Sequence, residues 1–218
     1  MRGILFDVDG TLVDTTYLHA VTWWEALSAA GYAPTMSRVH AAIGMGSDKI
    51  VEFLVGGDPD PDRDAALAAD HTRRYRRYWP SLRPLPGAVD LLRACRELDL
   101  AVVLASSASA EELTALRGAL NSDDLITAAT SSDDADRGKP APDILAAALT
   151  QSGLPADEVL FVGDSVWDIR AAARLRIPCA TLTCGGTCAA DLRAEGAAAV
   201  FTDPADLLTH LRDLVARQ

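Results

Sequence analysis

The sequence predicts an α/β protein built on a doubly wound parallel sheet, with a helical unit inserted after the first strand. From residue 101 onward, short apolar runs alternate with segments of helical periodicity, which is the pattern of consecutive βαβ units. Another short apolar run, Ile4–Phe6, lies near the start of the chain. The stretch between them holds helical patterns but no convincing strand. We therefore expect a sheet core over residues 1–14 and 82–218 and a separate helical unit over residues 15–81.

The elements of the first half follow from local patterns. Ile4–Phe6 is an apolar run that ends at polar residues, which is typical of a buried parallel strand. Helices of the inserted unit are expected at His19–Ala30, Asp48–Val55 and Arg63–Trp79, between breaks that contain glycine and proline. A proline-rich turn at residues 84–87 marks the return to the core and precedes a helix at Val89–Leu98.

In the second half, the expected strands and helices alternate. The strands are expected at Ala101–Ala105, Leu125–Thr130, Val159–Val162, Cys179–Leu182 and Ala199–Phe201. The helices are expected at Glu111–Leu120, Asp143–Ser152, Val166–Leu175 and Pro204–Val215. In open sheets of this kind, ligands bind at the carboxyl ends of the strands, so the residues that follow each strand are the candidates for function.

The composition is that of an ordinary globular protein, with 49% hydrophobic and 23% charged residues in 218 positions. The formal net charge of −11 disfavours nucleic acid or an anionic membrane as a partner. The basic and aromatic segment from His71 to Trp79 fits an amphipathic helix with its arginines in solvent better than a nucleic-acid surface. The sequence shows no sign of a required protein partner.

The four cysteines lack the spacing and the histidine neighbours of a zinc site, so we expect buried free thiols in a reducing compartment. Neither a signal peptide nor an apolar run long enough to cross a membrane is evident. We therefore expect a cytoplasmic protein that does not associate with membranes.

Two aspartates at the end of the first strand are the strongest candidates for chemistry. Asp7 and Asp9 are two residues apart, so in an extended segment their side chains share a face. Gly10 lets the backbone approach a ligand closely. A small anionic substrate beside two carboxylates needs compensating charge, which a hard divalent cation, above all Mg²⁺, supplies. The alternative is a solvated pair of aspartates in a turn.

Three later segments supply partners for these aspartates. Ser106 and Ser107 follow a predicted strand, where their hydroxyls can donate to phosphate oxygens or cap a helix. Lys139 lies in a proline-stiffened loop before a helix and is either a fixed positive charge of the site or a solvated surface residue. Asp164 follows another strand and is a candidate metal ligand. Asp168, one helical turn on, is a candidate support for Asp164 or Lys139.

Taken in order, these segments resemble the four motifs of the haloacid dehalogenase superfamily. The motif residues are Asp7, Asp9, Gly10 and Thr11, then Ser106, then Lys139, then Gly163, Asp164, Ser165 and Asp168. The match spans essentially the whole chain. The helical insert after the first motif resembles the C1 cap of the subfamily that includes phosphoglycolate phosphatase and beta-phosphoglucomutase. The resemblance thus implies a Rossmann-like core with an inserted α-helical cap domain.

The resemblance also implies a phosphatase that hydrolyses a small phosphorylated metabolite through an aspartyl-phosphate intermediate. Asp7 would be the nucleophile, and Asp9 would protonate the leaving oxygen and then activate water. Mg²⁺ would be held by the carboxylates of Asp7 and Asp164 and by the main-chain carbonyl of Asp9.

The same resemblance assigns the remaining motif residues to the phosphoryl group. Ser106, the Ser107 segment and Lys139 would hold its oxygens and spread the charge of the transition state. Asp168 would support these groups without touching the substrate.

Other activities of related proteins remain open alternatives. A dehalogenase is disfavoured, because a halide leaving group needs no proton and Asp9 would have no task. A beta-phosphoglucomutase-like mutase is closer, since His19 resembles a hinge residue of that enzyme and Lys49 lies where a cap residue would bind the sugar's phosphate. Gly163–Asp164 departs from the Glu-Asp of the mutases and favours the phosphatase. A non-catalytic binding module is disfavoured because both motif aspartates are present.

One further position departs from the family pattern. Arg176 stands where the family usually has a glycine that ends a helix. This departure affects only the expected local geometry.

Overall fold

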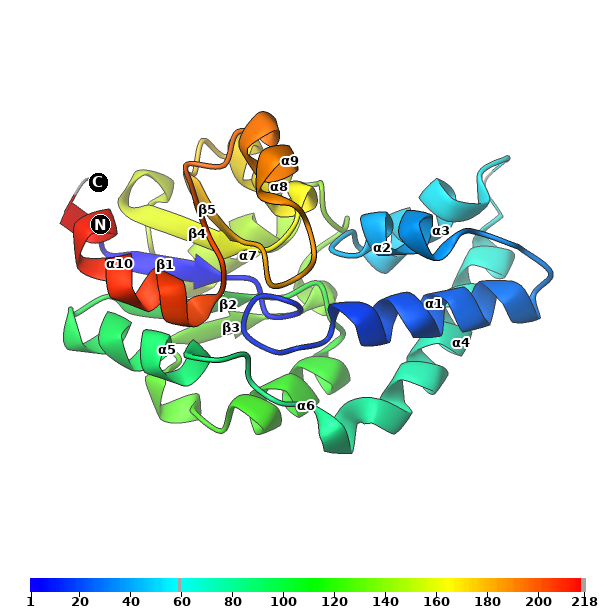
Figure 1. The fold of residues 1–218 in the computed structure, drawn as a ribbon, viewed down its shortest axis with the longest axis horizontal. Helices are drawn as coiled ribbons and strands as arrows, with labels where there is room; N and C mark the ends of the chain where they lie inside the picture. Colours follow the sequence, from blue (N-terminus) through cyan, green and yellow to red (C-terminus); the bar gives the residue numbers. More distant parts are fainter. Residues whose placement is uncertain (59, 217–218) are drawn as a thin grey trace.

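The core of the protein, seen in a computed structural model that describes residues 1–58 and 60–216, is a six-stranded parallel sheet. The strands are β1 (Gly3–Phe6), β2 (Ala101–Ala105), β3 (Ala128–Thr130), β4 (Val159–Gly163), β5 (Cys179–Leu182) and β6 (Ala199–Phe201). They lie in the order β3-β2-β1-β4-β5-β6 (Figure 1). Ile4 of β1 pairs with Val102 on one side and Leu160 on the other. The predicted doubly wound parallel sheet is confirmed.

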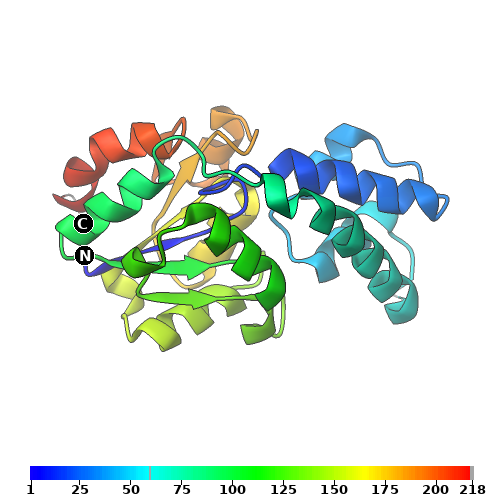
Figure 2. The same cartoon turned by 90° about the horizontal axis from the view of Figure 1, so that it is seen from below.

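Helices cover both faces of this sheet because its strands are apolar on both faces. One face carries α5 (Ala88–Glu97), α6 (Ala110–Leu120) and α10 (Pro204–Ala216), and the other carries α7 (Asp143–Ser152), α8 (Val166–Arg174) and α9 (Ala189–Glu195). Ile4 and Phe6 pack in the first layer and Leu5 in the second, as the two-residue period of a strand requires. Figure 2 shows α5 and α10 side by side on their face of the sheet.

A second group of helices lies beyond the end of the sheet to which β1 points (Figure 1). It contains α1 (Thr16–Ala29), α2 (Met36–Ala42), α3 (Ser47–Val55), α4 (Pro61–Tyr75) and the 3₁₀ segment Arg76–Ser81. These helices share an apolar core of their own, with Trp23, Leu27, Val51 and Leu67 among its members. The described part of residues 15–81 holds no strand of the sheet. We refer to this group as the cap, and its division from the core at residues 14 and 82 stays a prediction.

Several predicted boundaries were wrong. α2 and α9 were not predicted, because seven-residue helices offer too few turns for a clear 3.6-residue period. The strand expected from Leu125 begins only at Ala128, since Asp123–Leu125 forms a 3₁₀ turn. The helix expected to reach Trp79 changes to 3₁₀ geometry at Arg76, four residues before a proline that disfavours α geometry ahead of it.

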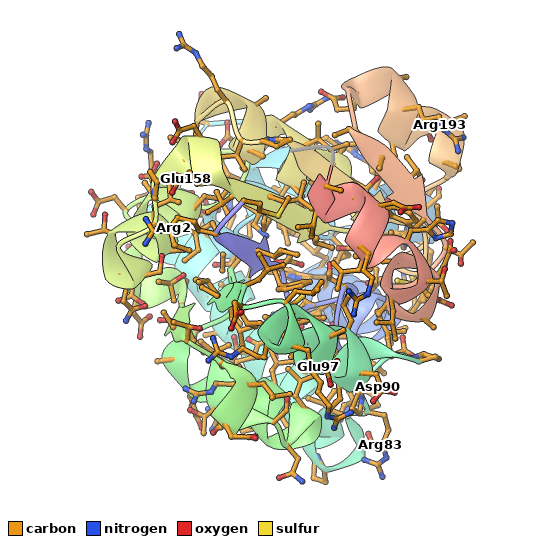
Figure 3. All side chains as sticks on the ribbon, turned by 90° about the vertical axis from the view of Figure 1, so that its left-hand side faces the viewer. Arg2, Arg83, Asp90, Glu97, Glu158 and Arg193 are labelled. Carbon is orange, nitrogen blue, oxygen red and sulfur yellow. The ribbon has the colours of Figure 1, made fainter. Side chains whose placement is uncertain are left out.

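The sheet edge opposite the cap carries surface features only. Arg2 and Glu158 form an exposed ion pair at 3.3 Å beside the start of β1 and β4, and the two side chains lie next to one another in Figure 3. None of the helices in the described part of the chain combines the length and the apolar character needed to cross a bilayer.

The cysteines differ from expectation in their exposure. All four are free, and Cys95 and Cys179 are buried as predicted. Cys184 is only half-buried and Cys188 is exposed, because both lie in the loop after β5 rather than in the sheet or under a helix.

Candidate active site

Three neighbouring strands end at the same edge of the sheet and bring the motif residues together. β1, at the centre, is followed by Asp7; β2 is followed by Ser106 and β4 by Asp164. All three side chains are buried. Because the strand order reverses at β1, this edge is where an open α/β sheet forms its ligand crevice.

Lys139, from the loop before α7, is the buried cation of this edge. Its ammonium donates to Asp7 Oδ1 at 2.5 Å and to Asp168 Oδ1 at 2.7 Å, and its side chain is only 1% exposed. Burial opposes the charged form, but the two carboxylates outweigh it and raise the pKa of the ammonium. Asp168 is itself held by the Ser165 amide at 3.0 Å and its hydroxyl at 2.6 Å. Lys139 is thus a fixed positive charge rather than a surface lysine.

Carboxylates outnumber the lysine at this edge. Oxygens of Asp7, Asp164 and Asp168 all lie within 4.8 Å of one another. Burial, partly offset by Lys139, raises the pKa of Asp7 to about 7. Burial and the neighbouring carboxylates raise the pKa of Asp164 well above its usual range. The group therefore needs more positive charge than the protein supplies, and this is the donor set of a hard divalent cation.

Two glycines let the backbone approach the Asp164 carboxylate closely. Gly10 and Gly185 face this carboxylate so closely that a Cβ at either position would overlap it. Thr11 bridges the two prospective ligands, donating to Asp164 Oδ1 at 3.2 Å and to Asp7 Oδ2 at 3.4 Å. Bare glycines around a set of buried carboxylates fit a metal site.

Asp9 turns away from these groups toward the cap. Its carboxylate accepts from the Thr15 hydroxyl at 2.8 Å and from His19 Nε2 at 3.1 Å. His19 Nε2 also lies 3.4 Å from Glu112 Oε1, and His19 Nδ1 lies 3.2 Å from His71 Nε2. The two aspartates of the first motif therefore occupy separate environments.

The ionisation of this second group follows from its contacts. Burial lowers the pKa of His19, but Asp9 and Glu112 outweigh it and the net shift is upward. Burial, with the neighbouring His19, lowers the pKa of His71 well below its usual value. A protonated His19 would donate from Nδ1 to His71 and from Nε2 to Asp9. Burial raises the pKa of Glu112 to about 7.

A cavity of about 140 Å³ lies between this edge and the cap. Four residues named in the sequence analysis line it, Asp7, Asp9, His19 and Ser107. Glu112, which was not named there, lines it as well. The Ser107 hydroxyl is buried and, within the described chain, has no hydrogen-bond partner. Ser106 Oγ instead accepts from the Ala108 amide at 3.1 Å. Lys49 does not line the cavity, and its ammonium pairs with Glu52 at 3.0 Å on the surface.

The cap is docked against the core around this cavity. Thr15 and His19 contact Asp9, as described above, and Arg76 pairs with Glu111. Further hydrogen bonds join the Gly46 amide to the Lys139 carbonyl at 3.2 Å, Trp167 Nε1 to the Ala41 carbonyl at 3.0 Å, and His40 Nε2 to the Gly185 carbonyl at 3.0 Å.

Three residues of the site escaped the sequence analysis, and Thr11 was named there as a motif residue without a role. Thr15 lies just after the first motif, and a hydroxyl near two aspartates was the available signal. His71 and Glu112 gave no such signal, because one is read as part of a basic helix and the other as a residue of the first turn of α6.

Known proteins resemble this chain over most of its length. The CbbY protein encoded on a plasmid of Cupriavidus necator is 31% identical over 94% of this chain and 88% of its own. The phosphoglycolate phosphatase of Yersinia pestis is 29% identical over 99% and 92%. A hydrolase from Pseudomonas syringae has a crystal structure with a TM-score of 0.92 at 34% identity, covering 98% and 99%. A Bacteroides vulgatus structure described as a beta-phosphoglucomutase shares the fold, with a TM-score of 0.90 at 20% identity over 99% and 89%.

The family itself is shown by a direct match. The family model for haloacid dehalogenase-like hydrolases covers residues 1–176, which contain all four motifs. The same residues meet at one edge of a sheet whose fold is shared with these relatives. The chain belongs to the haloacid dehalogenase-like hydrolase family.

Proposed function

We propose that this hydrolase is a Mg²⁺-dependent phosphatase of small phosphorylated metabolites and that it acts through an aspartyl phosphate at Asp7. The observation that carries the proposal is the separation of the two motif aspartates. Both line the cavity, but Asp7 lies beside Lys139 and Asp164, whereas Asp9 lies beside Thr15 and His19. A nucleophile needs the first environment and a proton-transfer group the second.

In the first half of the reaction, Asp7 attacks phosphorus and the bond to the leaving oxygen breaks. Lys139, 2.5 Å from Asp7, neutralises charge that builds up on the phosphoryl oxygens. The unpartnered Ser107 hydroxyl supplies a further donor. Bound Mg²⁺, with Asp7, Asp164 and the Asp9 carbonyl as ligands, would supply the positive charge that lets an anionic nucleophile meet an anionic phosphate.

Proton transfer falls to Asp9 in both halves. It gives a proton to the leaving oxygen in the first half, and it takes one from water in the second. The water then attacks phosphorus, inorganic phosphate leaves, and Asp7 is regenerated. The hydrogen bonds from Thr15 and His19 hold the Asp9 carboxylate in place for both steps.

The relatives support the reaction class and leave the substrate open. The Yersinia pestis relative is a phosphoglycolate phosphatase by name, and the family is one of hydrolases. We infer from these relatives a small phosphorylated substrate and a cytoplasmic enzyme. Mutase activity and a non-catalytic role remain the alternatives, and no observation in the structure favours either one.

The proposal is tested by replacing the nucleophile. Asp7→Asn should abolish phosphate release from a panel of phosphorylated metabolites, because an amide of the same size cannot attack phosphorus. Asp157→Asn, at an exposed position beside the far end of the sheet, is the matched control and should keep full activity. Chelation of Mg²⁺ should stop the native enzyme, and added Mg²⁺ should restore it. Turnover by a folded Asp7→Asn protein would refute the mechanism.

A further inference from the structure

We propose that the cavity beside Asp9 selects phosphomonoesters whose leaving group is uncharged and bears a hydroxyl, and that Glu112 is the residue that sets this preference. The inference rests on the proposed phosphatase function and adds a substrate class to it. It predicts that a carboxylate or a second phosphate next to the leaving oxygen is a poor fit.

The position of Glu112 carries the first step. The residue lies in the first turn of α6, is 8% exposed and lines the cavity. Its carboxylate, the His19 imidazole and the Asp9 carboxylate each place one atom within 4.8 Å of the others. An oxygen that receives a proton from Asp9 would therefore lie within several ångströms of Glu112, and so would the first carbons of the leaving group.

The charge around the cavity carries the second step. Among the lining residues in the described chain, the acidic ones are Asp7, Asp9 and Glu112, and none is a lysine or an arginine. In the described chain, the one basic side chain that places a nitrogen within 4 Å of a Glu112 oxygen is His19, and Asp9 shares it. An anionic group on the substrate would therefore lie near the Glu112 carboxylate without a lysine or arginine in the lining to pair with it.

The cations around the cavity are already paired. Lys139 is held by Asp7 and Asp168 and faces the phosphoryl site. Lys49 pairs with Glu52 at 3.0 Å, and the Arg137 guanidinium makes two contacts of 3.2 Å with Asp143. A second anionic group beside the leaving oxygen is thus opposed by Glu112 and not compensated elsewhere.

The remaining acceptors of Glu112 carry the last step. An ionised carboxylate offers about four lone-pair sites, and His19 occupies only one side of this carboxylate. A substrate hydroxyl donates to such an acceptor without bringing charge into the cavity. The rest of the lining combines apolar side chains with serine and threonine hydroxyls, which can bind a neutral or an anionic group. Glu112 is the lining carboxylate beside Asp9 that accepts from a hydroxyl and repels an anion.

Three phosphate esters of equal size test the proposal. 2-Hydroxyethyl phosphate, phosphoglycolate and phosphoethanolamine share a two-carbon frame that ends in a hydroxyl, a carboxylate or an ammonium group. We expect kcat/KM at pH 8 for the hydroxyl ester to exceed that for phosphoglycolate by at least about tenfold, the size of effect expected from one uncompensated like charge. A preference for phosphoglycolate, or for phosphoethanolamine over the hydroxyl ester, would overturn the assignment.

Variants show whether Glu112 is responsible. Glu112→Gln should reduce the ratio of kcat/KM for the hydroxyl ester to kcat/KM for phosphoglycolate by about fivefold or more. The change should come mainly from a lower KM for phosphoglycolate. Glu111→Gln, its exposed neighbour paired with Arg76 on the surface, is the matched control and should leave the ratio unchanged. An unchanged ratio in folded Glu112→Gln would remove Glu112 from the proposal.

The outcomes separate this inference from the function on which it rests. Phosphate release from phosphoglycolate in preference to the hydroxyl ester would refute the inference and leave the phosphatase standing. No release from any of the three esters or from p-nitrophenyl phosphate would refute both. The ratio for the native enzyme needs no variant, so a Glu112→Gln protein that fails to fold does not weaken the test.

Discussion

At the scale of single residues, the site assigns different tasks to identical side chains through their neighbours. Asp7 lies beside a lysine that is almost completely buried, and Asp9 lies beside an imidazole that bridges to a second carboxylate. Both aspartates come from one short segment, so their position after β1 follows from the sequence. Their different surroundings come from residues of other elements. Glu112 is likewise affected by its surroundings, because burial opposes the charge of its carboxylate.

Glu112 should therefore reduce stability at alkaline pH. Its pKa rises from an ordinary value of 4.5 to about 7 through burial. Between these two values the folded state binds a proton that the unfolded state releases, so the contribution of this group to stability falls as pH rises through that window. Glu112→Gln removes the effect and should raise the free energy of unfolding by about 1–3 kcal/mol at pH 8.

The pH dependence distinguishes this gain from a general stabilisation. The difference between Glu112→Gln and the native protein should shrink as pH falls from 7 to below 4.5, where both states hold the proton. Urea unfolding at several pH values measures it, and Glu111→Gln should show no such trend. A Glu112→Gln protein that is less stable than the native one at pH 8 would contradict the assignment.

Three of the residues that the sequence analysis named share one property. Asp7, Ser106 and Asp164 each follow a strand, and in a parallel sheet the residues that follow strands meet at one edge. Glu112 and His71 are brought to Asp9 by the packing of α6 and α4, which no local pattern encodes. The sequence therefore predicts the phosphoryl side of the site better than the side that faces the leaving group.

At the scale of elements, the loop between α2 and α3 closes the cavity by a direct backbone contact. Gly46 donates to the Lys139 carbonyl, and a Cβ at Gly46 would overlap the Cα of Gly138. The φ angle of Gly46 is −63°, which any residue can adopt, so an alanine there is opposed by its neighbours, the Gly138 backbone of the core and the Asp48 carboxylate. The glycine thus serves the docking of the cap onto the lysine loop.

Gly46→Ala should therefore impair catalysis more than folding. A displaced loop misplaces Lys139, and misplacements of about 1 Å can cost on the order of 100-fold in rate, so we expect kcat/KM to fall by about 10- to 100-fold. Gly118→Ala is the matched control, because a Cβ there meets nothing within 4 Å. Equal activity of the two variants would show that the contact is unnecessary.

The end of α8 shows a position where the sequence departs from the preferred backbone chemistry. Arg176 lies two residues after the end of α8. It has a φ of 58°, and its amide donates to the Ala173 carbonyl. This left-handed conformation is one that glycine adopts without a Cβ clash. The family glycine has been replaced, and the backbone geometry has been kept.

Arg176→Gly should consequently stabilise the protein. Relief of the left-handed strain should add about 0.5–1 kcal/mol, or about 2–4 °C in Tm for a chain of this size. Gly153→Ala is the reverse experiment, since Gly153 ends α7 with φ of 69° and open space around it, and it should lower Tm by a similar amount. A lower Tm for Arg176→Gly would mean that the arginine side chain makes a favourable contribution of its own.

At the scale of the whole molecule, two apolar cores meet across the site. The sheet and its helices bury one set of side chains, and α1 to α4 bury another around Trp23. The alternation of strands and helices made this division predictable, but the way the cap docks was not, because it depends on contacts between residues far apart in the chain, such as Ala41 with Trp167. In the proposed reaction, docking of the cap would shield the substrate from bulk water.

The fate of the phosphoryl group decides between phosphatase and mutase. Both reactions pass through phospho-Asp7, so nucleophile variants and metal dependence cannot separate them. A mutase has to return the phosphoryl group to a sugar hydroxyl and to hold a bisphosphate intermediate, whose second phosphate needs a cation in the cap. Lys49, the candidate for that task, is paired with Glu52 away from the cavity lining.

We therefore expect stoichiometric release of inorganic phosphate from beta-glucose 1-phosphate, with little glucose 6-phosphate even when a trace of glucose 1,6-bisphosphate is added. Rapid isomerisation with negligible phosphate release would reverse this ranking, and loss of that isomerisation in Lys49→Ala would then assign the second phosphate to the cap.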